Sequence, residues 1–153
     1  MAEIITLDQV FSLTNGLATL GWALLLFTPN WHVTRKLLFS LLVPALLCAA
    51  YLIAMFAFPA EEGMDFSSLD SVAAMFTQRE VVLVGWIHYL AFDLMVGLWI
   101  SSNARKHDIK HIYIVLPLIF TFMLGPIGLL AYLILRGILL KKMAVSNFDL
   151  GSA

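Results

Sequence analysis

Residues 80–105 read EVVLVGWIHYLAFDLMVGLWISSNAR, and this stretch decides the fold class. Between Glu80 and Arg105 only Asp93 carries a formal charge, with histidine counted as neutral. The stretch is longer than the roughly 20 apolar residues that a helix needs to cross a bilayer. A helix is expected because backbone N–H and C=O groups in lipid must be satisfied within their own segment. The stretch therefore predicts a transmembrane helix over residues 80–101.

Three further stretches are long enough to cross a bilayer and contain no Asp, Glu, Lys or Arg. They lie between Asp8 and Arg35, between Lys36 and Glu61, and between His111 and Arg136, and they predict helices over 7–28, 36–58 and 112–138. Charged residues make up only 12% of the chain, against about 25% in a soluble domain. The sequence predicts an all-α integral membrane protein with a four-transmembrane-helix bundle in residues 1–142 and a flexible tail over 143–153.

The connection between the second and third spans contains a helical pattern of its own. Ser67 and Asp70 are spaced as in a capping box. Four apolar residues then recur at i, i+3, i+4 and i+7, namely Leu69, Val72, Ala73 and Phe76. We therefore expect a short interfacial helix over residues 67–77 that lies on the membrane surface.

The charged residues orient the bundle. With four spans, the basic loops 29–36 and 101–111 share one side, and the acidic loop 59–79 lies on the other side with both termini. Lys and Arg favour the cytoplasm, so both termini are expected on the non-cytoplasmic side. The net charge of -1 and the absence of a basic run exclude a nucleic-acid-binding protein. The single cysteine excludes an internal disulfide and a cysteine-rich zinc site.

Asp93 and His88 are costly residues for a membrane span. An aspartate at mid-span costs about 2.5–3.5 kcal/mol, so Asp93 should face the bundle interior. It shares a helix face with Trp86, Tyr89 and Gly97, whereas His88 points about 140° away at 100° per residue. We expect Asp93 to meet a polar stripe on the first helix, made of Asp8, Ser12, Asn15, Thr19 and Trp22.

The predicted spans place four polar side chains at one depth. Counting from the helix ends puts Asn15, Tyr51, His88 and Tyr132 in one layer, with Asp93 deeper and near Trp22. Two prolines should bend their helices, Pro44 in the second span and Pro126 in the fourth. The missing N–H of Pro126 leaves the carbonyl of Phe122 free to accept another donor.

Three roles for Asp93 and His88 remain open. Intramembrane polar groups often hold helices together by hydrogen bonds. Ionisable residues inside spans also commonly serve acid–base chemistry or ligand contact. A haem or metal role is the weakest, because one in-membrane histidine supplies a single ligand. His32, His107 and His111 could form a metal site at the surface, but such residues are more often solvated loop residues. No cofactor is expected.

The quoted stretch, together with ARKHDIKH (104–111) and LPLIFTFMLGPIGLLAYLILR (116–136), resembles the abscisic-acid-deficient-four-like family. The plant members of that family are chloroplast proteins required for making neoxanthin from violaxanthin. The residues that carry the resemblance are Trp86, His88, Tyr89, Asp93, Thr121, Gly125, Pro126 and Gly128. It extends over about residues 7–140. The chain begins without a long transit peptide, so we expect a bacterial member in the inner membrane.

The resemblance implies an isomerisation that needs no cofactor. Opening a carotenoid epoxide to an allene needs an acid at the oxygen and a base at the neighbouring chain carbon. Asp93 would be the acid and His88 the base. The residues expected to contact a carotenoid or isoprenoid ligand are Asn15, Trp22, Tyr51, Trp86, Tyr89 and Tyr132. The alternative is a non-catalytic protein that binds lipid or pigment or supports a partner enzyme. Membrane lipid and a second copy of the chain are the other expected partners.

Overall fold

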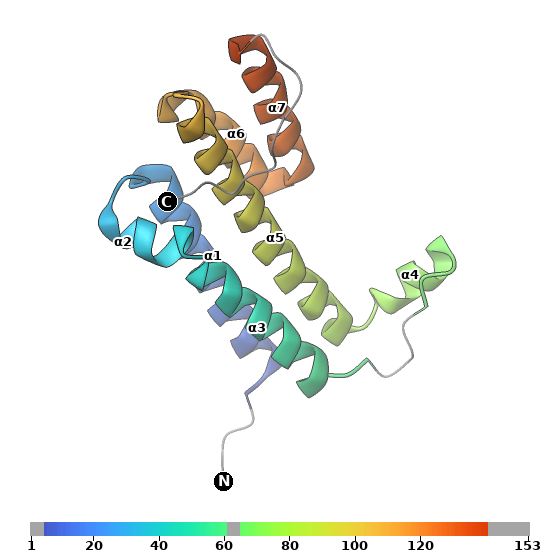
Figure 1. Cartoon of the computed structure of the whole chain (residues 1–153). Helices are drawn as coiled ribbons and strands as arrows, with labels where there is room; N and C mark the ends of the chain where they lie inside the picture. Colours follow the sequence, from blue (N-terminus) through green and yellow to red (C-terminus); the bar gives the residue numbers. More distant parts are fainter. Residues whose placement is uncertain (1–4, 61–64, 141–153) are drawn as a thin grey trace.

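The computed structural model describes residues 5–60 and 65–140, and this part of the chain is helical with no strand. The elements are α1 (Leu7–Phe27), α2 (His32–Thr34), the π-helical turn η1 (Arg35–Phe39), α3 (Leu42–Ala57), α4 (Leu69–Met75), α5 (Arg79–Lys106), α6 (His111–Leu124) and α7 (Pro126–Leu140) (Figure 1). Three helical segments are long and apolar enough to cross a membrane: α1, the run His32–Ala57 that comprises α2, η1 and α3, and α5. The first three predicted spans are therefore confirmed as helices of membrane-crossing length and composition.

Helix α5 is the centre of the molecule. It packs against α1 and α3 along one part of its length and against α6 and α7 near its C-terminal end (Figure 1). Its fully buried side chains include Leu94 and Leu98, which lie in one apolar core with Trp22 of α1. The helix runs parallel to α1, and Asp8 accepts a 2.7 Å bond from Arg79 near the N-terminal ends of the two helices.

The second span is interrupted near its start. Leu41 adopts the left-handed conformation with φ 63°, between η1 and α3. Pro44 then falls in the first turn of α3, where a missing N–H leaves no intrahelical hydrogen bond unmade. The expected bend at Pro44 is therefore wrong, because the chain bends before the proline.

The prediction of one continuous helix over 112–138 is wrong. Helix α6 ends at Leu124 and α7 begins at Pro126, with Gly125 between them at φ 28°. Pro126 is the first residue of α7, a position that suits proline. The 14 residues of α6 and 15 of α7 rise about 21 and 22 Å, less than the roughly 30 Å of a hydrocarbon core.

Helix α7 folds back beside α6 (Figure 1). A Cβ at Gly128 would lie 2.1 Å from the backbone nitrogen of Thr121, so the two helix backbones meet here. As a result α7 ends near the start of α6, at the end of the molecule opposite to the start of α1 (Figure 1). The expectation that the fourth helix returns the chain to the N-terminal side is wrong for the described residues. The predicted tail 143–153 lies outside them.

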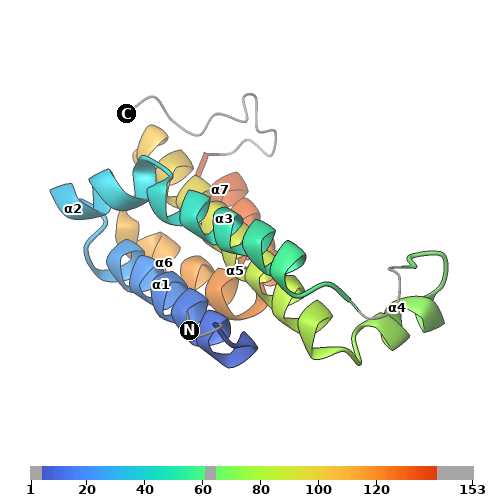
Figure 2. The same ribbon diagram turned by 90° about the horizontal axis from the view of Figure 1, so that it is seen from below.

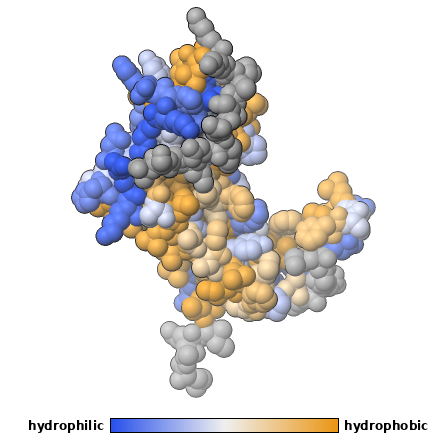
Figure 3. Space-filling view, viewed as in Figure 1, coloured by the Kyte–Doolittle hydropathy of each residue, from blue (hydrophilic) through white to orange (hydrophobic). Residues whose placement is uncertain are grey.

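We call the end that carries Arg35, Lys106 and His111 the basic end, and the opposite end the N-terminal end. Hydrophilic side chains gather at the basic end, and the rest of the visible face is mostly hydrophobic (Figure 3).

Helix α4 confirms the helical part of the segment predicted over 67–77. It begins after Ser68, whose hydroxyl accepts from the backbone N–H of Ser71 at 3.0 Å. The capping residue is thus Ser68 rather than Ser67. Helix α4 projects away from the other helices in both views (Figures 1 and 2). Its place on a membrane surface stays a prediction.

Candidate functional site

Asp93 is buried at the point where α6 turns into α7. The side chain is 9% exposed, and a Cβ at Gly125 would lie 2.6 Å from its Oδ1. Its Oδ2 is buried and has no hydrogen-bond partner among the described residues. The expectation that Asp93 faces the interior is confirmed. Its close neighbour is the α6–α7 turn rather than the expected polar stripe of α1.

That stripe does not face inward as a whole. Ser12 and Thr19 are exposed, and the buried residues of α1 are Thr14, Ala18, Gly21, Trp22 and Leu25. The Ser12 hydroxyl donates to the Asp8 carbonyl of its own helix at 2.8 Å. Back-bonding of this kind lets a serine face lipid without a partner on another helix.

The Tyr89 hydroxyl bridges α5 and α6 one turn before Asp93. It donates to the carbonyl of Phe122 at 3.2 Å. This is the carbonyl that Pro126 leaves without its helical donor, as the sequence predicts. The free carbonyl of the turn thus receives its hydrogen bond from a side chain of α5. The phenol of Tyr89 and the buried carboxyl of Asp93 both lie beside this turn. Sequence reasoning missed Gly125 as a neighbour of Asp93, because a glycine followed by a proline is compatible with a kink as well as with a chain reversal.

Asn15 and Trp86 join α1 to α5 nearer the N-terminal end. Trp86 Nε1 donates to Asn15 Oδ1 at 3.0 Å. The Trp86 ring has its centroid 6.1 Å from that of Phe11 and 5.3 Å from that of Tyr89. Phe11 is 44% and Trp86 39% exposed. We call Phe11, Trp86 and Tyr89 the aromatic surface; it is partly open and leads along α5 towards Asp93.

Trp22 belongs to the core. It is 2% exposed, and its ring lies 5.4 Å from the ring of Phe122. A Cβ at Gly97 would lie 2.6 Å from Cη2 of Trp22, so Gly97 admits the indole against α5.

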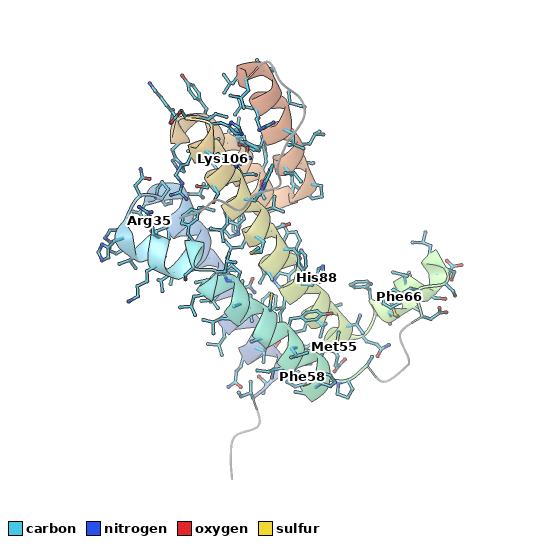
Figure 4. The ribbon with its side chains drawn as sticks, in the orientation of Figure 1. Arg35, Met55, Phe58, Phe66, His88 and Lys106 are labelled. Atoms are coloured by element: carbon cyan, nitrogen blue, oxygen red, sulfur yellow. The ribbon has the colours of Figure 1, made fainter. Side chains whose placement is uncertain are left out.

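His88 is not brought together with Asp93. It is exposed, stacks on Phe92 at 4.5 Å between ring centroids, and lies 5.9 Å from the ring of Tyr51 on α3. His88 thus contacts α3, and it points away from Asp93 as the helical spacing predicts. It lies between the basic end, marked by Arg35 and Lys106, and the opposite end, marked by Phe58 (Figure 4). An acid–base pair of Asp93 and His88 on one substrate atom is not assembled.

Tyr132 lies in a different place from the predicted polar layer, because α7 runs back to the basic end. Its hydroxyl donates to Asn103 Oδ1 at 2.7 Å, and Arg136 Nε donates to the same oxygen at 3.0 Å. Arg136 Nη2 also lies 3.2 Å from Nε2 of His107. These residues tie the end of α5 to α7 in a buried polar cluster. Asn103 was missed by sequence reasoning, although an asparagine inside an apolar helix is the signal for such a cluster.

The histidines near the basic end have partners of their own. His111 Nε2 lies 2.9 Å from the carbonyl oxygen of Leu26, His107 contacts Arg136, and His32 packs on the Trp31 ring. Burial and the nearby charges of Arg136 and Lys106 lower the pKa of His107, and Asp108 opposes them. No group of three or more metal-ligating side chains comes together in residues 5–60 and 65–140.

Comparison with known proteins identifies the family. The model of the ABA DEFICIENT 4-like family matches residues 9–132, and the chain belongs to that family. The resemblance found in the sequence is thereby confirmed. Neither a curated protein nor a solved structure matches the chain.

Proposed function

We propose that this ABA DEFICIENT 4-like protein binds a long apolar isoprenoid of the carotenoid type along α5, with a polar group of the ligand at Asp93. The observation that carries the proposal is the Asp93 carboxyl. It is buried, and its Oδ2 has no partner in the described part of the chain. A buried polar atom without a partner costs free energy that a ligand hydroxyl or epoxide could recover.

The short α6–α7 hairpin supports this placement. It covers the half of α5 towards the basic end and turns beside Asp93 (Figure 1). The aromatic surface beyond the turn is therefore left partly open, and flat aromatic rings suit a conjugated chain. A ligand would enter this surface from the surrounding lipid.

The chemistry we propose is proton transfer at a ligand oxygen. Protonation of an epoxide oxygen by the Asp93 carboxyl opens the ring, and loss of a proton from the adjacent chain carbon completes an isomerisation. Burial favours the neutral, proton-donating form of a carboxyl. A carboxyl that has donated from one oxygen can accept through the other, so the reaction does not require His88 at the same atom. Tyr89 would orient the ligand oxygen.

The test uses the full chain, purified in mild detergent from a carotenoid-producing host, with bound isoprenoids identified by mass spectrometry. We expect a retained carotenoid or related isoprenoid, and less of it in Trp86→Ala. Trp31→Ala is the matched control, because Trp31 is an exposed tryptophan at the basic end. Retention of phospholipid alone, or equal loss in both variants, contradicts the binding site.

Catalysis is tested separately with an epoxycarotenoid. Asp93→Asn should keep the bound ligand and lose conversion to the isomer, while His88→Gln keeps both. The second candidate function, binding without turnover, is favoured by the separation of His88 from Asp93, because a single carboxyl would then have to act as both acid and base. It predicts no conversion by the unmodified protein and a graded loss of bound ligand with each aromatic substitution.

We also propose that the basic end faces the cytoplasm of a bacterium. Six of the nine Lys and Arg residues lie at this end: Arg35, Lys36, Arg105, Lys106, Lys110 and Arg136. Arg79 lies at the other end, and Lys141 and Lys142 directly follow the last described residue of α7. With α7 returning to the basic end, the charge bias is stronger than a four-span arrangement gives.

A further inference from the structure

A second candidate binding site lies at the basic end, away from Asp93. A cavity of about 100 Å³ opens between the α1–α2 loop, the end of α5 and the start of α6. Its polar lining comes from Asn30, Ser101, Arg105 and His111. At roughly 30 Å³ for each water, the space holds about three water molecules or one group of the size of a phosphate.

Ser101 supplies a buried hydroxyl to this cavity. The residue is 2% exposed, and it lines the cavity. Most serines in apolar helices bond back to a carbonyl one turn earlier. A serine hydroxyl that borders a cavity can instead bond to a ligand in it.

Arg105 and His111 are held in place beside it. The Arg105 guanidinium carbon lies 4.0 Å from the centroid of the Phe39 ring, a cation–π contact that restrains the side chain. His111 Nε2 lies 2.9 Å from the Leu26 carbonyl, and a carbonyl only accepts, so Nε2 carries the hydrogen. The other ring nitrogen of His111 is left for a proton or a ligand. Helix α6 begins at His111, and no side chain caps its first turn. Free N–H groups at such a helix start attract anions.

The charge around the cavity is positive. Arg35 lies close enough to Arg105 to repel it. The ion pair found within the described residues, Arg79–Asp8, is at the opposite end. Asp108 is the nearest carboxylate in sequence, and its charge acts on His107. Among the described residues, the lining of the cavity therefore contains the guanidinium group of Arg105 and no carboxylate, a combination that attracts an anion.

We infer that this cavity binds a phosphate group, with Arg105 giving the charge and Ser101 and His111 giving hydrogen bonds. The phosphate is that of an anionic phospholipid headgroup or of a soluble phosphate compound. Arg105 lies in the last turn of a membrane-crossing helix, which is the depth of lipid headgroups. This site is independent of the proposed isoprenoid site.

The lipid arm of the test measures retention of phosphatidylglycerol against phosphatidylcholine by native mass spectrometry after reconstitution of the full chain. Unmodified protein should retain phosphatidylglycerol preferentially. Arg105→Gln and Ser101→Ala should each weaken retention, Arg105→Gln by roughly tenfold, as loss of a charged hydrogen bond does. Lys36→Gln and Ser102→Ala are the matched controls, since neither residue lines the cavity.

The second arm titrates inorganic phosphate into protein in neutral detergent, followed by thermal stabilisation. Stabilisation that is lost in Arg105→Gln supports a soluble phosphate as the ligand. Arg105→Lys separates charge from the planar guanidinium and should recover only part of the binding if the protein is folded. No preference in either arm, or equal losses in Lys36→Gln and Arg105→Gln, overturns the inference.

Discussion

The contact between Gly125 and Asp93 leaves no room for a side chain at position 125. A Cβ at position 125 would lie 2.6 Å from Oδ1 of Asp93, and the φ of 28° disfavours any residue other than glycine. Gly125→Ala should therefore lower thermal stability in detergent by roughly 2 kcal/mol or more. Gly16→Ala is the control, because nothing lies within 4 Å of its Cβ, and it should stabilise α1 by roughly 0.5–1 kcal/mol. Equal shifts in the two variants would be inconsistent with the Asp93 contact.

The carboxyl of Asp93 should contribute little or nothing to stability. Because its Oδ2 lacks a partner in the described structure, Asp93→Leu removes a desolvation cost and should leave thermal stability unchanged or higher. Tyr132→Phe provides the contrast, since it removes a 2.7 Å bond to Asn103 and should cost about 0.6–1.7 kcal/mol. If Asp93→Leu proves as damaging as Tyr132→Phe, Asp93 is a structural residue and the proposed function loses its basis.

The helices themselves show where sequence reasoning works and where it stops. The length of the apolar stretches predicts α1, α3 and α5, because every backbone N–H and C=O group in lipid must be hydrogen-bonded within its own helix. It does not distinguish a kinked span from two shorter helices, because 112–138 is equally apolar in both cases. A glycine followed by a proline allows either outcome. The contact that decides between them joins Gly125 to Asp93, far away in the chain, and hydropathy carries no information about it.

The link between α5 and α7 should respond to pH. The pKa of His107 is lowered by burial and by Arg136, so the folded state favours neutral imidazole. Above a pH of about 6.5, the ordinary histidine pKa, the imidazole is neutral in both the folded and the unfolded chain, and it does not affect stability. As pH falls below that value the unfolded chain binds the proton first, and stability declines.

His107→Gln keeps an acceptor for Arg136 and should flatten that decline in thermal unfolding measured between neutral and acidic pH. His32→Gln is the control, because His32 is exposed and packs on Trp31. A decline that survives His107→Gln would assign the pH response to another group.

For the molecule as a whole, the register of α1 against α5 was predictable, whereas the path of the chain through α6 and α7 was not. Counting residues from the first charge of each helix puts Asn15 and His88 at one depth, and Asn15 in fact bonds to Trp86, within a turn of His88. The same counting fails for Tyr132, because it assumes that the fourth helix crosses the membrane. Of the predicted ligand contacts, Asn15, Trp86 and Tyr89 therefore gather near the N-terminal half of α5, and Tyr132 does not join them.

The path of the chain makes a direct prediction about its two ends. After replacement of the exposed Cys48 by serine, single cysteines at Ala2 and at Ala153 should be labelled from opposite sides of sealed vesicles. Three crossings and a hairpin that returns to its own side give this result, whereas four crossings give labelling from one side. Same-side labelling would contradict the hairpin. A cysteine at Lys110 should react from the same side as Ala153.

The hairpin of α6 and α7 also bears on how the protein is made. Because α6 enters and α7 leaves at the same end, the polar segments on either side of the hairpin need not pass through the bilayer during insertion. A fourth crossing would carry Arg136, Lys141 and Lys142 through the hydrocarbon, and each such residue costs about 2.5–3.5 kcal/mol at mid-bilayer. With the basic end facing the cytoplasm, as proposed, the translocation machinery has to pass only the segment before α1 and the loop that contains α4. The last two helices can then insert from the cytoplasmic side, where they are synthesised.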